Sequence, residues 1–261
     1  DKEALLRSGI MLPKTIRHLK GEDLKDAIPD KLYIPLTDIR MLTKVDLLML
    51  EMLANCNWER PLYLAISVGS VSKLKFDNYF VQEGLAFRFT PFDYKKWGDV
   101  GENRLYAVDV ERLYDNVMNR YKYGGLDTPG LYLDETTLRT CWYHRRLFAQ
   151  LAKELIAQGD NERAKKVLAY AEQVIPGYNV PETHESGSYD IATAYAALGE
   201  KTKAVTLAVH LIAEAEDYIN WAFSLKGNRI EMVRNDCIYK FWQWNQYNEL
   251  LKKIDGEKYK E

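Results

Sequence analysis

The pattern of apolar and polar residues changes along the chain, and the change predicts two regions. Between residues 43 and 55 apolar residues recur every three or four positions, which is typical of a helix with one buried face. A nearly continuous apolar run over 62–68 predicts a strand buried on both faces. An alternating run over 84–89 predicts a second strand. The expected apolar face of the first helix consists of Val45, Leu48, Met49, Met52 and Leu53.

Shorter elements surround these three. The pattern predicts a helix over 2–7, an edge strand over 32–36, one or two helical turns over 75–80, a loop over 91–103 and a third strand over 105–108. Helix, strand, short helix and strand in this order indicate a small α/β layer. We therefore predict an α+β protein whose residues 1–134 form a small α/β sheet module.

Two aspartates precede predicted helices. Asp109 is expected to cap a helix whose inward stripe consists of Leu113, Val117 and Tyr121. Asp134 and Glu135 form an adjacent carboxylate pair at the start of the next helix. Such a pair could perform acid–base chemistry, but negative charge also stabilises the N-terminus of a helix, and we favour capping.

From residue 135 onward the pattern is helical. Helices are expected over 136–158, 161–175, 186–198, 201–215, 217–224 and 229–254. Residues 135–261 are therefore predicted to be an all-α region.

Two segments of this region repeat at an offset of forty residues. The first copy contains Leu151, Ala152, Leu155, Gly159 and Ala164, and the second contains Ile191, Ala192, Tyr195, Gly199 and Ala204. The spacing resembles a tetratricopeptide repeat, in which two helices form a hairpin. The glycines are expected at the turns, and the alanines where paired helices approach closely. Phe148, Leu151, Leu155 and Leu168 are expected to fill the interior.

The second copy is degenerate, because Ser188, Ala208 and Glu216 occupy positions that prefer an aromatic residue, Phe and Pro. An ordinary helical bundle remains the alternative. Two repeats are fewer than the roughly three that a free-standing stack needs. The α/β module is expected to cover one end, and the last helix the other. The covering residues of that helix would be Ile230, Val233, Cys237, Ile238, Phe241, Trp244 and Leu251.

Composition narrows the possible functions. The 261 residues carry a formal net charge of −2, which argues against nucleic-acid binding, and no apolar run reaches the length of a membrane span. The chain starts at Asp1 rather than Met, so we expect it to be a processed or excised piece. Three widely separated cysteines, Cys56, Cys141 and Cys237, indicate buried free thiols rather than disulfides or a zinc site.

Specific catalytic motifs are absent from the sequence. It contains no GxGxxG, GxxxxGK[ST], GxSxG or HExxH, and His18, His144, His184 and His210 lack metal-ligand spacing. Aromatic clusters, such as that around Trp242 and Trp244, suit sugars or protein interfaces, but these two rings point to different sides of a helix. We therefore predict no catalytic, cofactor-binding or metal-binding residue, and no cofactor.

Four segments in order carry a family resemblance. They are 57–63 (Asn-Trp-Glu-Arg-Pro-Leu-Tyr), 79–88, 114–118 and 129–135 (Pro-Gly-Leu-Tyr-Leu-Asp-Glu). Together they resemble the C-terminal soluble region of the domain of unknown function 2723 family, multi-span membrane proteins of Bacteroidetes, most closely over residues 43–176.

The resemblance implies membrane helices that look like the C-type glycosyltransferase fold, related to protein O-mannosyltransferases. This chain would then be a non-catalytic periplasmic domain, anchored to the inner membrane by its own transmembrane region and presenting an acceptor protein, peptide or glycan. Two alternatives stay open. One is a free-standing peptide-binding scaffold, and the other is a soluble glycan-acting enzyme that uses an acidic pair including Asp134.

Overall fold

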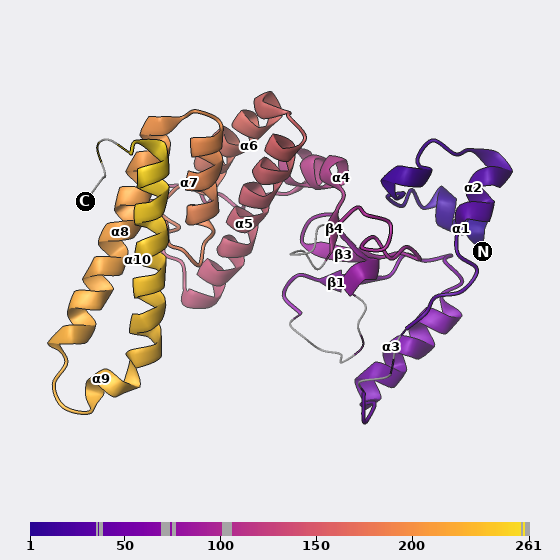
Figure 1. The fold of residues 1–261 in the computed structure, drawn as a ribbon, viewed down its shortest axis with the longest axis horizontal. Helices are drawn as coiled ribbons and strands as arrows, with labels where there is room; N and C mark the ends of the chain where they lie inside the picture. The colour runs from indigo at the N-terminus through magenta and orange to yellow at the C-terminus, as the bar shows by residue number, and fades with distance from the viewer. Residues whose placement is uncertain are drawn as a thin grey trace. The chain divides into compact units, whose positions relative to one another are not determined.

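The computed structural model describes residues 1–34, 36, 39–68, 74, 77–100, 106–256 and 258 (Figure 1). The chain forms two compact units, Asp1–Asn116 and Val117–Glu261. The first contains a small sheet and the second is helical, so the predicted α+β class is confirmed. The predicted boundary between residues 134 and 135 divides an α/β module from an all-α region. That boundary stays a prediction.

The first unit contains short helices around four strands. The helical elements are α1 (Lys2–Arg7), the 3-10 turn η1 (Lys14–Ile16), α2 (Gly21–Ala27), α3 (Lys44–Asn55), the 3-10 turn η2 (Asp77–Tyr79), α4 (Val110–Asp115) and the π-helical turn η3 (Asn116–Arg120), which continues into the second unit. The strands are β1 (Tyr63–Ala65), β2 (Phe80–Gln82), β3 (Ala86–Phe89) and β4 (Ala107–Val108). The predicted helices over 2–7 and 43–55 are confirmed, and Asp109 caps α4 as predicted.

The strands form one mixed sheet in the order β1-β3-β2-β4. β3 pairs antiparallel with β1 and β2, whereas β2 and β4 are parallel. Both faces of β2 are covered, because successive side chains of a strand point to opposite faces. Val81 packs with Leu5, Ile10, Ile16 and Ile28 from the N-terminal segment. Phe80 packs on the other face in a cluster with Phe89.

Two expectations for this unit are wrong, and one strand was not predicted. The apolar run over 62–68 forms only the three-residue edge strand β1, in which Tyr63 is 49% exposed, because β1 pairs with β3 alone. The pattern did not predict β2. On α3, Met49, Leu50 and Leu53 face the core, whereas Val45, Leu48 and Met52 are exposed. The expected strand over 32–36, the turn over 75–80, the loop over 91–103 and the strand over 105–108 fall partly outside the described residues.

The described residues of the second unit form six α-helices after the π-helical turn. They are α5 (Glu135–Ala157), α6 (Asn161–Val174), α7 (Ser188–Ala197), α8 (Lys201–Ser224), α9 (Arg229–Met232) and α10 (Arg234–Ile254). α5 packs against α6 and α7, and α8 packs against α7 and α10. The predicted helices over 201–215 and 217–224 are a single helix, because no Gly or Pro interrupts the segment.

The repeated small residues lie where the offset predicts. Ala152, Ala164, Ala192 and Ala204 are fully buried. Gly159 and Gly199 adopt φ of +80° and +78° in the turns that join α5 to α6 and α7 to α8. Phe148, Leu151, Leu155 and Leu168 fill the interior, as expected. Two similar helical hairpins are therefore present, and their relation to tetratricopeptide repeats stays a prediction.

The last helix covers α8 with part of the expected face, and Val233 and Trp244 pack there as predicted. Cys237, Tyr247, Leu250 and Leu251 are buried, but Ile238 and Phe241 are 58% and 43% exposed. The buried stripe also includes Gln243, a polar residue that the search for apolar periodicity passed over. Two of the three cysteines are buried and Cys56 is partly exposed. None of the described helices is long and apolar enough to cross a membrane.

Gly187 and Gly159 provide a matched test of this packing. Gly187 has φ +85°, and an added Cβ would lie 2.9 Å from Cγ and 3.3 Å from Cα of Arg146 on α5. Gly159 has a similar φ but open space around it. We expect Gly187→Ala to lower the free energy of unfolding by about 2–4 kcal/mol, and Gly159→Ala by about 1–2 kcal/mol, measured by urea denaturation. Equal losses would contradict the close approach of α5 to the start of α7.

Candidate functional site

A pocket of about 420 Å³ lies within the second unit, between α6, α7, α8 and the connector that joins α6 to α7. Its volume is in the range of small-molecule sites. Apolar residues from the three helices and the connector form part of its lining, namely Leu168, Ala171, Ile175, Pro176, Ile191 and Leu207. The polar lining residues include Arg145, Glu172, Glu182, Tyr195, Lys203 and His210.

The connector, residues 175–187, is held in place by one buried guanidinium. Arg145 extends from α5 and is 3% exposed. Its Nη1 donates to the Pro181 carbonyl at 2.7 Å and to Ser186 Oγ at 3.1 Å, and its Nη2 donates to the carbonyls of Ile175 at 3.0 Å and Val180 at 2.6 Å. Burial lowers the pKa of Arg145 to about 10, so the group stays charged at neutral pH. Arg145 therefore fixes one wall of the pocket.

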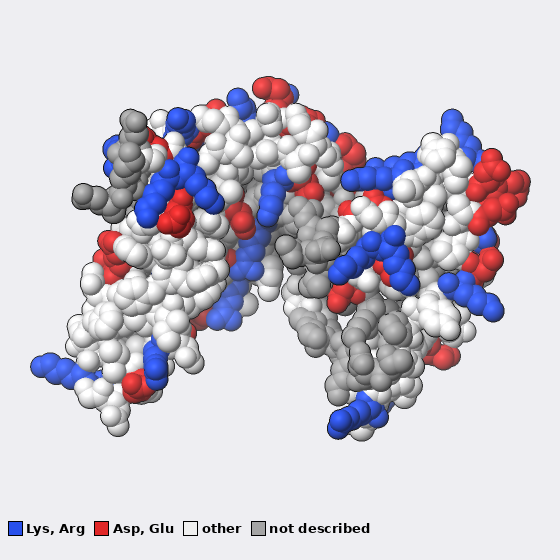
Figure 2. Space-filling model, in the orientation of Figure 1, with Lys and Arg blue, Asp and Glu red and all other residues white. Residues whose placement is uncertain are grey.

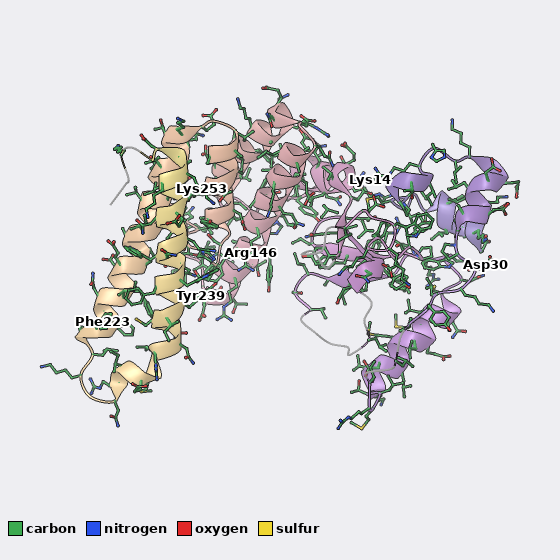
Figure 3. All side chains as sticks on the ribbon, in the orientation of Figure 1. Lys14, Asp30, Arg146, Phe223, Tyr239 and Lys253 are labelled. Atoms are coloured by element: carbon green, nitrogen blue, oxygen red, sulfur yellow. The ribbon has the colours of Figure 1, made fainter. Side chains whose placement is uncertain are left out.

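Further bonds hold the two ends of the connector. Asn179 donates to the carbonyls of Leu126 and Thr128 at 2.7 and 2.6 Å. Thr183 and Ser186 form a reciprocal turn, in which each backbone N–H donates to the other hydroxyl at 3.1 Å. At the end of the connector Arg146 Nε donates to the Glu185 carbonyl at 2.6 Å (Figure 3).

Glu172 organises the opposite polar wall. The Tyr195 hydroxyl donates to Glu172 Oε1 at 2.5 Å, and Lys203 Nζ donates to Oε1 and Oε2 at 2.9 and 2.8 Å. Burial and the neighbouring Glu172 carboxylate raise the pKa of Tyr195 above its ordinary value. Tyr195 is thus a neutral donor, and Lys203 keeps one proton free for another acceptor.

Glu182 differs from the other acidic residue of the lining. Its side chain is partly buried, and among the described residues its carboxylate has no hydrogen bond or ion pair. The pocket thus combines an apolar surface with an unoccupied acceptor at Glu182 and a spare donor at Lys203. This combination suits a ligand that carries both apolar surface and hydroxyl, amide or amino groups.

The same groups do not form a recognisable catalytic set. Catalysis by a nucleophile needs an activating base within hydrogen-bond reach, and among the described lining residues the hydroxyl bonded to a carboxylate is that of Tyr195, whose partner Glu172 is also bound by Lys203. Within the described part of the chain, no three His, Cys, Asp or Glu residues are placed to hold a metal ion.

The residues singled out from the sequence lie elsewhere. Asp134 caps α5 as predicted, accepting from the Thr136 and Thr137 amides at 2.9 and 3.1 Å. Trp242 is 50% exposed, whereas Trp244 packs against the cluster of Ile219, Ala222 and Cys237. The two rings thus point apart, as expected.

The pocket residues were not predicted. Lys203, Glu172 and Arg145 read as ordinary charged helix residues in the sequence. Arg145 alone carries a signal, because it lies four residues after Cys141 and three before Phe148, on the buried stripe of α5. A charged residue on such a stripe needs a partner, but the sequence does not say that backbone carbonyls thirty to thirty-six residues away provide it.

Two histidines occupy aromatic surroundings in the second unit. The His184 ring lies 5.7 Å from Tyr189 and 6.0 Å from Trp242, centroid to centroid, and its Nδ1 is hydrogen-bonded to the Tyr247 hydroxyl at 2.8 Å. The His144 ring lies 5.8 and 5.4 Å from Tyr121 and Tyr123. Burial lowers the pKa of both imidazoles, so both are neutral at neutral pH.

A second polar cluster lies in the first unit. Glu83 is 6% exposed and forms ion pairs with Arg88 at 3.5 Å and Arg112 at 3.3 Å, and it accepts from the Tyr63 hydroxyl at 2.9 Å. Arg88 also donates to the Ser8 carbonyl at 3.0 Å. These bonds join the sheet to the segment after α1 and to α4, which is a structural role.

Comparison with known families concerns this first unit. Residues 2–111 match the family model of TMEM260-associated domain 2. The TMEM260-associated domain 2 match includes the sheet, Glu83 and Arg88, and the pocket of the second unit lies outside it. No curated protein and no solved structure matches the chain.

Removal of the Arg145 guanidinium tests whether this group holds the connector in place. We expect Arg145→Met to lower the free energy of unfolding of the helical unit by about 3–5 kcal/mol, because three carbonyls and a hydroxyl lose a charged, buried donor. The control is Arg139→Met on the same helix, where the ion pair with Glu135 is exposed and little change is expected. Urea denaturation followed by circular dichroism measures both, and similar losses would contradict the assignment.

The buried imidazoles predict an acid-sensitive fold. As pH falls through about 6.5 the unfolded chain binds protons at His144 and His184, whereas the folded chain, with lowered pKa values, does not. The unfolded state is therefore favoured, and stability falls between about pH 7 and 5.5, by at most about 1.4 kcal/mol per pH unit for each imidazole.

The variant His144→Phe isolates one of these groups. Nδ1 of His144 is buried without a hydrogen-bond partner, so the ring nitrogen contributes no bond that Phe would lose. We expect stability at pH 7.5 to be retained and the slope of unfolding free energy against pH to decrease. An unchanged slope from urea denaturation at several pH values would show that His144 titrates alike in both states.

Proposed function

We propose that this chain is a non-catalytic interaction domain of a membrane-embedded, glycosyltransferase-like protein. In this proposal the pocket between α6, α7 and α8 receives part of an acceptor protein, peptide or glycan. The single observation that carries it is the composition of that pocket, whose described lining combines an apolar surface with a Glu182 carboxylate that forms no hydrogen bond or ion pair.

The family match supports the membrane-protein part of the proposal. TMEM260-associated domain 2 is by its description a domain associated with a TMEM260 protein, and residues 2–111 match it. The resemblance to the domain of unknown function 2723 family agrees in kind, since those proteins carry membrane helices. On this basis the chain belongs to the periplasmic side of the inner membrane, with its own transmembrane region as its permanent partner.

The two helical hairpins support the interaction part. Tetratricopeptide-like hairpins present surfaces to other chains, and the buried alanines that let α5 approach α6 and α7 approach α8 agree with such a repeat. The long connector, held by Arg145, adds a wall that a minimal hairpin pair lacks.

A free-standing peptide-binding scaffold is the second candidate. One observation favours it, because the pocket lies wholly in the second unit, outside the matched residues. The soluble enzyme is disfavoured, because one oxygen of Asp134 accepts two backbone amides and the other accepts the Thr137 hydroxyl at 2.6 Å. Those bonds lower the pKa of Asp134, which opposes a role as general acid.

Filling the pocket tests the proposal. Thr206 is an exposed lining residue of α8, and Val209 is an exposed residue of the same helix outside the lining. We expect Thr206→Trp to reduce binding at least tenfold on an array of Ser/Thr-rich peptides and their O-mannosylated forms, whereas Val209→Trp retains it. Isothermal titration calorimetry with the strongest array ligand measures the dissociation constant of each variant, and the ratio of these constants gives the loss.

Other outcomes would count against the proposal. Equal binding by both variants and the parent chain would place the ligand elsewhere, and no binding by the parent chain would remove the acceptor-presenting role. Transfer from a polyprenyl-phosphate-linked sugar by the isolated chain would show that it is an enzyme. Transfer by the full-length protein but not by the chain agrees with the proposal.

A further inference from the structure

The paired ends of α8 and α10 form an extension of the helical unit. α7 has 10 residues and α8 has 24, which correspond to lengths of about 15 and 36 Å. α7 can therefore cover only part of α8. Figure 1 shows the end of α8, α9 and the start of α10 projecting past α7. We call residues 219–241 the hairpin tip.

The interior of this hairpin tip is narrow. Ile219 and Ala222 of α8 pack against Cys237 of α10, and the partly buried side chains around them are Tyr218, Val233 and Trp244. Two helices alone can bury only the stripe along which they meet. Most of the remaining side chains of the tip are exposed, with Leu225, Ile230 and Lys240 partly buried.

Those outward side chains are apolar to an unusual degree. Large apolar residues with 43–84% exposure are Trp221, Phe223, Met232, Ile238, Tyr239 and Phe241. In Figure 2 side chains other than Lys, Arg, Asp and Glu cover most of the visible face of this part of the unit. At the far ends of the same two helices the exposed residues are polar or charged, such as Lys201, Glu249, Lys252 and Lys253. The exposed apolar residues of α8 and α10 are thus concentrated at the tip, with Trp242 directly beside it and Val209 as an isolated exception on α8.

The apolar groups surround the tip. Trp221 and Phe223 are two residues apart on α8, which places them about 200° apart around the helix. Phe223 lies against Phe241 of α10, with ring centroids 6.1 Å apart, whereas Trp221 lies against Tyr218 at 5.3 Å (Figure 3). A flat protein interface covers one face of a hairpin, so rings on opposite sides favour a medium that encloses the end.

The charges at the tip indicate what kind of surroundings enclose it. Residues 225–235 contain three basic residues and one acidic residue in a chain whose net charge is −2. Arg234 pairs with Glu231 at 3.6 Å. Lys226 and Arg229 have no ion pair or hydrogen bond with any part of the chain that the structure describes. Trp, Phe and Ile beside unpaired Lys and Arg match the boundary between acyl chains and anionic headgroups.

The depth of the apolar zone agrees with an interface. Trp221 and Phe223 lie within three residues of the end of α8, and Ile238 lies four residues after the start of α10. At about 1.5 Å per residue these three lie within roughly 6 Å of the helix ends, and Phe241, seven residues after the start of α10, lies at about 10 Å. Interfacial helices bury their apolar face by about 5–10 Å. We infer that the hairpin tip inserts into the surface of an anionic bilayer, with Lys226 and Arg229 against lipid phosphates.

Vesicle flotation tests the inference with the purified chain. We expect the chain to bind vesicles of 70% phosphatidylcholine and 30% phosphatidylglycerol, and the double variant Phe223→Ser, Met232→Ser to bind about tenfold more weakly. The matched control is Tyr132→Ser, because Tyr132 is 88% exposed in the same unit but outside the tip. Circular dichroism and the urea midpoint confirm that the variants are folded.

The basic residues of the tip provide a second, independent test of the inference. We expect Lys226→Gln, Arg229→Gln to weaken binding to the anionic vesicles several-fold, and 0.5 M NaCl to do the same. Absence of binding, or equal binding by the tip variant and the parent chain, would overturn the inference. So would a parent chain that is dimeric by ultracentrifugation and becomes monomeric in the tip variant, because the tip would then be a protein interface. The pocket variant Thr206→Trp should bind vesicles normally, which separates this result from the proposed function.

Discussion

The hydrogen bonds of the buried Arg145 guanidinium hold together the part of the helical unit that differs from a simple pair of hairpins. The connector from Ile175 to Gly187 would otherwise leave several carbonyls facing a dry interior. One side chain from α5 satisfies three of them and a serine hydroxyl. Because a buried charge is costly without partners, the connector and the helix stabilise each other. Because these hydrogen bonds fix the connector, they also fix the wall that it contributes to the pocket.

The helical unit uses its polar groups in two different ways. Around Arg145 and Glu172 the donors and acceptors are paired at hydrogen-bond distances, which makes the walls of the pocket rigid. Glu182 on the pocket lining and Lys226 and Arg229 at the hairpin tip form no hydrogen bond or ion pair with the described groups. Polar groups that the fold leaves unpaired are the ones available to a ligand or a surface. The proposed pocket function and the proposed bilayer contact both use such groups.

The small sheet in the first unit depends on the coverage of both its faces. β2 is only three residues long, and it is stable because Val81 and Phe80 are buried in separate clusters on opposite sides. Glu83, directly after β2, then pairs with two arginines that join the strand to the N-terminal segment and to α4. Side-chain packing and one ionic cluster stabilise this sheet, because its short strands form few backbone hydrogen bonds with one another.

The sequence by itself determined the features that depend on neighbours within a few positions. Helix periodicity, the aspartate caps at Asp109 and Asp134, and the turn glycines Gly159 and Gly199 are local, and the structure confirms them. The buried alanines followed from the forty-residue offset. Only the tertiary structure decided which apolar residues are buried, because β1 lies at an edge and α10 turns Ile238 and Phe241 outward. It also decided the pocket, because Arg145 meets its partners thirty or more residues away, and no local pattern encodes a contact at that distance.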